Sequence, residues 1–141
     1  MGILRRATPT DLAALLALHE EAFDDERRPA ADAVKAGLPQ AWVLPGPGRL
    51  DGAFFLKPGA EAYLWDLAIH PGTRGQGVGG KLLAHAEAES RRANAASLLV
   101  EAEEQDPRLV AWYVGHGFSP AGRTQDFFHA GCSAIRLRKV L

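Results

Sequence analysis

The sequence predicts an α/β fold in which an antiparallel meander leads into a central parallel strand pair, giving a mixed sheet with helices on both faces. Two observations support this fold class. Short apolar runs at 41–44, 52–56 and 63–69 are separated by tight turns rich in proline and glycine, which is typical of antiparallel strands. A helical pattern then separates the run at 63–69 from another at 97–100, and a strand–helix–strand crossover makes such strands parallel.

The remaining elements follow from local signals. An apolar stripe from Leu12 to Phe23 has helical spacing and includes His19, which we expect to be packed rather than to bind a ligand. Asp106 followed by proline predicts a capped helix that stops at Gly117. We also expect a first strand at 3–7, a second helix at 29–36, turns at 45–48 and 126–131, and a last strand at 134–140.

Composition narrows the class of protein. The chain has 141 residues, and we expect residues 1–141 to form a single domain with its own core. The chain is 47% hydrophobic with a net charge of −1, which favours a globular protein and argues against a nucleic-acid-binding surface. The single cysteine, Cys132, excludes an intrachain disulfide. With no signal peptide or membrane-length apolar run found, we expect a cytoplasmic protein without membrane contact.

The stretch from Tyr63 to Arg92 organises the chain. It begins as a strand, passes through a glycine-rich turn and becomes helical from Gly77 onward. Free N–H groups and the helix dipole make such a junction suitable for an anion. No Gly-Lys-Ser/Thr follows, so this is not a P-loop. The spacing Gly75-x-Gly77-x-x-Gly80 also fits a dinucleotide-binding fingerprint, which keeps a nucleotide-binding protein as an alternative.

The loop with Arg74, Gly77 and Gly79, together with Tyr113-x-x-x-Gly117-Phe118, resembles the GNAT superfamily of acetyl-CoA-dependent N-acetyltransferases. The resemblance covers residues 60–141 well and implies the GNAT acyl-CoA N-acyltransferase fold with acetyl-CoA as co-substrate. It implies that the strand residues Leu67, Ala68 and Ile69 pair with the pantetheine arm of coenzyme A. It also implies that the pyrophosphate is bound by the loop residues Arg74, Gly75, Gln76, Gly77, Val78, Gly79 and Gly80.

Alternation should put Glu101 and Glu103 on one face of the strand end, with Ala102 opposite. Glu101 directly follows a buried apolar run, so partial desolvation should raise its pKa and make it a better base. The C-terminal half is most similar to the ribosomal-protein alanine N-acetyltransferases. This resemblance implies that Glu101 is the catalytic base and Tyr113 the acid. It places Asp106 where those enzymes have an asparagine that contacts pantetheine, although Asp106 also fits a helix cap. Asp66 is either a rival base or a charge paired with a neighbouring strand.

These resemblances predict a transferase, an acyltransferase that moves the acetyl group of acetyl-CoA onto a primary amine by direct attack in a ternary complex. The acceptor is a small cationic amine or a protein amine. A strand like that of Asp66 occurs in aminoglycoside 3-N-acetyltransferases, which keeps a small cationic amine as one of the two options. The alternative is a non-catalytic coenzyme A-binding module of the same fold. The sequence does not determine the oligomeric state, and a homodimer is one option. The five histidines lack metal-ligand spacing, so we expect no metal.

Overall fold

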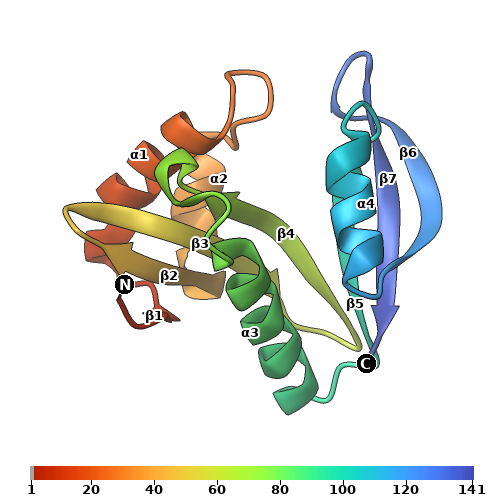
Figure 1. Cartoon of the computed structure of the whole chain (residues 1–141), viewed down its shortest axis with the longest axis horizontal. Coiled ribbons are helices and arrows are strands. Elements are labelled where there is room, and N and C mark those ends of the chain that lie inside the picture. Colours follow the sequence, from red (N-terminus) through yellow and green to blue (C-terminus); the bar gives the residue numbers. More distant parts are fainter. Residues whose placement is uncertain (1) are drawn as a thin grey trace. The chain divides into compact units, whose positions relative to one another are not determined.

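The computed structural model describes residues 2–141 and shows one seven-stranded sheet with the strand order β1-β2-β3-β4-β5-β7-β6 (Figure 1). Strands β4 and β5 pair in parallel, whereas β1–β2, β2–β3, β5–β7 and β6–β7 are antiparallel. The predicted mixed sheet with a parallel pair is therefore confirmed. The strands are β1 (Arg5–Arg6), β2 (Ala41–Gly46), β3 (Arg49–Lys57), β4 (Glu61–Ile69), β5 (Ser97–Glu103), β6 (Ser119–His129) and β7 (Cys132–Val140).

Four α-helices and three short 3-10 turns complete the described residues 2–141. The chain divides into two compact units. Unit 1 comprises the residues up to Lys57 together with Asp66–Ala86, and unit 2 comprises Pro58–Trp65 with Glu87–Leu141. The single domain over 1–141 stays a prediction. The helices are α1 (Leu12–Ala22), α2 (Ala31–Gly37), α3 (Val78–Arg92) and α4 (Pro107–Gly115), and the turns are η1 (Pro9–Asp11), η2 (Leu38–Gln40) and η3 (Pro71–Thr73).

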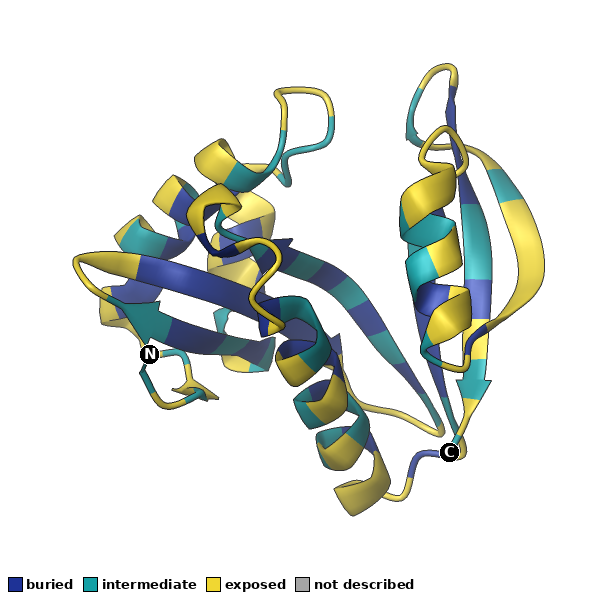
Figure 2. Ribbon diagram, in the orientation of Figure 1, coloured by how far each residue is buried: buried dark blue, intermediate teal, exposed yellow. Residues whose placement is uncertain are grey.

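In unit 1, helices cover both faces of the sheet, as predicted. Side chains alternate along β4, so neighbouring residues face opposite sides. Asp66 contacts His19 of α1, which packs against β3. Leu67 and Ile69 instead pack against a buried cluster that includes Val78 of α3. The apolar stripe of each helix therefore faces its own side of the sheet, and Figure 2 shows the corresponding buried stripes.

In unit 2, local signals from the sequence fixed the ends of α4. The carboxylate of Asp106 accepts a hydrogen bond from the N–H of Leu109 at 3.1 Å, so the predicted cap is confirmed. Gly117 lies just beyond the helix with φ +95, the left-handed conformation expected at this position. Along β5, Ala102 is buried whereas Glu101 and Glu103 are only half-buried, which confirms the predicted alternation.

The turn predicted at 126–131 is wrong in its extent. Strand β6 continues to His129, and only two residues, Ala130 and Gly131, turn into β7. The ladder between the two strands is irregular from Thr124 to His129, and Asp126 has φ +52. Its carboxylate accepts the N–H of Gly131 at 2.8 Å. A β-bulge therefore produced the turn-like sequence signal, because bulges use the same residue types as turns.

The turn predicted at 45–48 is also shorter in the structure. Strand β2 runs on through Pro45 to Gly46, and the register shifts between Leu44 and Pro45. Proline has no N–H to donate, so a strand can pass through it only where the ladder is irregular or at an edge. At the N-terminus the ladder is limited to Arg5–Arg6, within the strand expected at 3–7.

Candidate functional site

The loop that follows β4 is held by hydrogen bonds within unit 1. The N–H of His70 donates to the carbonyl of Asp51 on β3 at 2.9 Å, which fixes the point where the strand ends. The hydroxyl of Thr73 donates to the carbonyl of His70 at 2.9 Å, and Nδ1 of His70 accepts the N–H of Gly72 at 3.0 Å. The start of the loop is therefore preorganised by short local contacts.

Gly75 and Gly77 both have φ +79, a conformation that side-chain-bearing residues rarely adopt. A Cβ atom added at either position would meet no atom within 4 Å. Glycine is therefore required by the backbone conformation, and the space beside this backbone is open. Helix α3 begins at Val78, and the first N–H groups of a helix have no acceptor within it. This arrangement suits an anion approaching the backbone.

The other predicted coenzyme-binding residues of unit 1 differ in their exposure and in their hydrogen bonds. Arg74 is exposed, and its Nη2 donates to the carbonyl of Ala22 at the end of α1 over 3.4 Å, a long bond. Val78 and Ala68 are buried, so their side chains are not exposed to a ligand. Exposed Gln76 donates its N–H to the carbonyl of Thr73 at 3.3 Å. The contacts of these residues with coenzyme A stay predictions.

Glu101, the predicted base, lies in unit 2 with its two carboxylate oxygens in different surroundings. Oε1 accepts a hydrogen bond from the hydroxyl of Tyr63 on β4 at 3.4 Å. Oε2 is buried and has no hydrogen-bond partner among residues 2–141. Burial raises the pKa of Glu101, while the charge of Arg136 and the bond from Tyr63 act in the opposite direction. A carboxylate with a raised pKa is a stronger base, as predicted from the sequence.

Two neighbours of Glu101 were not found by sequence reasoning. Arg136 lies directly opposite Glu101 in the antiparallel pair of β5 and β7. Tyr63 pairs with Leu99, two residues before Glu101 on the same face. Burial and the negative charge of Glu101 raise the pKa of Tyr63 to about 12, so its hydroxyl keeps its proton. Alternation along the last strand indicates the face of Arg136, but strand register was needed to place it beside Glu101.

Tyr113, the predicted acid, is also in unit 2 and is 5% exposed. Its ring packs edge-on against Phe118, with 5.4 Å between ring centroids, and against Trp112, at 5.1 Å. These contacts fix the direction of the phenol ring. Asp106 caps α4 and is exposed, so its helix-capping role is confirmed while its contact with pantetheine stays a prediction.

Asp66, the rival base, is buried in unit 1. Its Oδ2 lies 2.7 Å from Nε2 of His19, and the two residues are 8% and 1% exposed. The predicted pairing of Asp66 is confirmed, but the partner comes from helix α1 rather than from a neighbouring strand. The ring of His19 also packs against Phe23 and Phe55, which confirms that this histidine is a packed residue.

Comparison with known proteins places the chain in a family. The model of the acetyltransferase (GNAT) family matches residues 13–118. The chain belongs to the GNAT acetyltransferase family. This family membership is consistent with acyl transfer and with the predicted fold. A search of curated protein sequences returned no match.

Solved structures with low sequence identity share this GNAT fold. The ribosomal-protein-S18-alanine N-acetyltransferase from Escherichia coli is 20% identical with a TM-score of 0.88, over 99% of this chain and 94% of that chain. The ribosomal-protein-alanine N-acetyltransferase from Brucella melitensis is 21% identical with a TM-score of 0.80, over 99% of both chains. GphF, a GNAT-like decarboxylase in complex with isobutyryl-CoA, is 19% identical with a TM-score of 0.84, over 98% of both chains. At such identities the likeness shows the fold alone.

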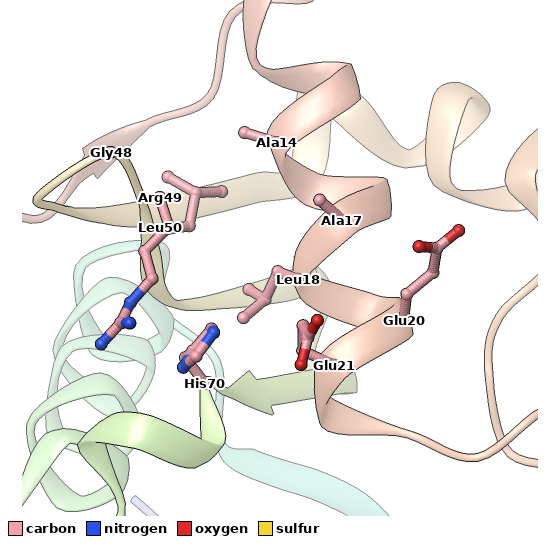
Figure 3. Close-up of a pocket in the computed structure, with 9 residues that line it drawn as sticks. All are labelled: Ala14, Ala17, Leu18, Glu20, Glu21, Gly48, Arg49, Leu50 and His70. Carbon is pink, nitrogen blue, oxygen red and sulfur yellow. The ribbon is translucent and has the colours of Figure 1, made fainter.

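One further pocket of this GNAT chain, in unit 1, was not anticipated. It has a volume of about 270 Å³ and lies between α1 and the start of β3 (Figure 3). Glu20 and Glu21 border it from α1, Arg49 and His70 border it from the other side, and Leu18 of α1 points in between. The predicted site residues are not among the described residues that line it. The pocket is small for a cofactor as large as coenzyme A.

No group of three or more histidine, cysteine, aspartate or glutamate side chains in residues 2–141 is arranged to bind a metal ion. Within the same residues, every helix is too short or too polar to cross a membrane.

Proposed function

We propose that this GNAT protein transfers the acetyl group of acetyl-CoA to a primary amine by direct attack in a ternary complex. The observation that carries the proposal is the loop from Arg74 to Gly80. Two of its glycines are in the left-handed conformation with open space beside them, and a 15-residue helix starts directly after it. Backbone N–H groups at such a junction can bind the pyrophosphate of coenzyme A.

The proposed reaction needs little covalent chemistry from the protein. The unprotonated amine attacks the carbonyl carbon of the thioester, a C–N bond forms, the C–S bond breaks and coenzyme A leaves as a thiolate. Before the attack, the ammonium form of the acceptor gives one proton to Glu101, directly or through water. After the attack, the nitrogen gives a second proton to the solvent, and backbone N–H groups stabilise the oxyanion. Tyr113 supports the departing sulfur through a hydrogen bond. A tyrosine pKa near 10 exceeds that of a thiol near 8.5, so complete proton transfer would be uphill by about 2 kcal/mol.

The acceptor determines how much a base contributes. An amine with a pKa of about 10.4 needs about 4.6 kcal/mol for deprotonation at pH 7, whereas an α-amine near 7.8 needs only about 1 kcal/mol. The raised pKa of Glu101 suits either class. Two structural neighbours are named as N-acetyltransferases of ribosomal-protein alanine, which supports a protein α-amine as one candidate. A small cationic amine is the other.

The first test compares ligands in thermal unfolding. Acetyl-CoA should raise the melting temperature, whereas NAD and ATP should not. At 100 times its dissociation constant, a ligand adds about 2.7 kcal/mol to the free energy of unfolding. Isobutyryl-CoA belongs in this panel, because one neighbour of the same fold binds it. An unchanged melting temperature at saturating acetyl-CoA would reject the proposal.

The second test measures release of coenzyme A. Acetyl-CoA is mixed with a peptide that begins with alanine, with spermidine and with an aminoglycoside, and free thiol is followed over time. Release with any of these amines supports the transferase. Binding of acetyl-CoA without release across the panel would favour the alternative, a coenzyme A-binding module without turnover.

A further inference from the structure

Three side chains of unit 2 converge on one face of the sheet. Tyr63 on β4, Glu101 on β5 and Arg136 on β7 face the same side because of the strand registers, since Tyr63 pairs with Leu99 and Glu101 pairs with Arg136. Three strands distant in the sequence therefore supply an acid, a phenol and a guanidinium to one place. All three residues are half-buried, so they share a partly desolvated environment.

The hydrogen bonding of this trio is incomplete. Tyr63 donates to Oε1 of Glu101 at 3.4 Å, longer than an ordinary O–H···O bond. Oε2 of Glu101 is buried without a partner in the described part of the chain, and the same holds for Nε of Arg136. Buried carboxylate oxygens are rarely left unpaired in folded proteins, so an unpaired one requires an explanation. One explanation is that Oε2 of Glu101 has no protein partner because it accepts a proton from a substrate.

We propose that Tyr63 is a positioning residue for Glu101: its hydroxyl holds Oε1 and leaves Oε2 as the oxygen that receives the proton of the acceptor amine. This inference rests on the proposed function. The proton passes from the amine nitrogen to Oε2, the carboxylate becomes a neutral carboxyl group, and the nitrogen keeps the electron pair that attacks the thioester. Tyr63 exchanges no proton, because its own pKa is about 12.

Arg136 has a separate electrostatic role in the same arrangement. It opposes the effect of burial on Glu101 and so keeps the carboxylate able to accept a proton near neutral pH. The charged and titratable groups that face Glu101 across its neighbouring strands are Tyr63 from β4 and Arg136 from β7, and Glu103 follows on the same strand. Arg138, two residues further along β7, is engaged with Glu61 instead and offers a matched control.

The first experiment measures the ionisation of Glu101 directly. The carboxyl carbons of glutamate are labelled with ¹³C, and the Glu101 signal is assigned by its loss in Glu101→Gln. Tyr63→Phe should move the titration midpoint of Glu101 to higher pH, because the phenyl ring cannot donate to the carboxylate. Arg136→Gln should do the same, whereas Arg136→Lys and Arg138→Gln should leave the midpoint near that of the wild-type protein. Unchanged midpoints in both Tyr63→Phe and Arg136→Gln would overturn the arrangement.

The second experiment is a double-mutant cycle in turnover. With acetyl-CoA and a peptide that begins with alanine, Tyr63→Phe should lower kcat about two- to tenfold, the range for one lost hydrogen bond. KM for acetyl-CoA should not change, and the acid limb of the pH–rate profile should move to higher pH. In the Glu101→Gln background, Tyr63→Phe should have no further effect. An equal loss in both backgrounds would show that Tyr63 acts on something other than Glu101.

The outcomes separate this inference from the proposed function. Loss of turnover in Glu101→Gln, together with wild-type turnover and an unmoved acid limb in Tyr63→Phe, would overturn the role of Tyr63 and leave the transferase intact. Wild-type turnover in Glu101→Gln would instead show that Glu101 is not the base, and the proposed role of Tyr63 would then be rejected as well. Thermal unfolding of each variant confirms that it is folded.

Discussion

Asp66 and Glu101, the two acids that the sequence offered as a base, both lie on strands, and their surroundings differ in one decisive respect. Asp66 in unit 1 is 8% exposed and lies 2.7 Å from the imidazole of His19. Glu101 in unit 2 is half-buried, and its one described hydrogen bond, from Tyr63, is 3.4 Å long. In addition, the second oxygen of Glu101 has no partner among the residues described.

The difference teaches how to separate a structural acid from a candidate base. A carboxylate that is buried against a buried imidazole contributes to packing, and a substrate would have to break that contact to use it. A carboxylate with one free oxygen and a pKa raised by burial can accept a proton without losing a contact. Asp66 lies inside an apolar run and Glu101 directly follows one, so the sequence pattern alone could not rank them. The surroundings favour Glu101 as the base.

The largest expected effect is on turnover. With an acceptor amine of pKa about 10.4, such as spermidine, Glu101→Gln should lower kcat about 10²- to 10⁴-fold at neutral pH, the range for loss of a general base. The loss should shrink as pH rises toward the pKa of the acceptor, because an amine that is already neutral needs no base. The measurement is the pH dependence of coenzyme A release, with Asp66→Asn as the control. If Asp66→Asn showed the pH-dependent loss of turnover and Glu101→Gln remained near wild type, Asp66 and not Glu101 would be the base.

The next effect is on stability and should fall on the other acid. Asp66→Ala should lower the free energy of unfolding by about 3 kcal/mol, where the ranges for a broken buried hydrogen bond and a broken buried ion pair meet. The reason is that Nδ1 of His19 is already buried without a partner in residues 2–141, so the variant leaves both ring nitrogens unpaired. Urea denaturation measures this change. A similar loss in Glu101→Ala would remove the distinction between the two sites.

A smaller effect on turnover should come from Tyr113→Phe. The phenol is proposed to interact with sulfur only as negative charge develops, so kcat should fall about tenfold while the dissociation constant of acetyl-CoA stays the same. In contrast to Glu101→Gln, this loss should not shrink as pH approaches the pKa of the amine. Equilibrium binding and the pH–rate profile test both parts. A pH-dependent loss like that of Glu101→Gln would mean that Tyr113 and Glu101 share one proton-transfer role.

The smallest effect concerns pH and stability. Burial raises the pKa of Glu101 in the folded protein, so the folded state holds its proton to higher pH than the unfolded state. The contribution of Glu101 to the stability of the wild-type protein is therefore largest at acid pH. It falls as pH rises from the unfolded-state pKa to the folded-state pKa and is constant above that. The Glu101→Gln variant has no carboxyl group to titrate at this position. The free energy of unfolding of the variant, minus that of the wild type, should therefore increase as pH rises above about 4. A difference that is constant from pH 4 to pH 8 would contradict the effect of burial.

The sequence by itself determined the parts of this protein that depend on local rules. The sequence predicted the strand, glycine turn and helix around Gly75 and Gly77, the cap at Asp106, and the alternation that places Glu101 on the face opposite Ala102. All of these are present in the structure. Each depends on backbone conformation, capping or a period of two or 3.6 residues, which neighbouring residues fix among themselves. The same local rules failed where a bulge around Asp126 imitates a turn.

Only the tertiary structure decided which side chains meet. Asp66 and His19 are 47 residues apart in the sequence, and the bond from Tyr63 to Glu101 spans 38 residues. Arg136 reaches Glu101 because β7, rather than the preceding strand β6, pairs with β5. Strand order and register are set by the packing of the whole core, since a shift of one residue would turn each of these side chains to the opposite face. The local sequence pattern therefore indicated a base, and the pairing of distant strands decided its neighbours.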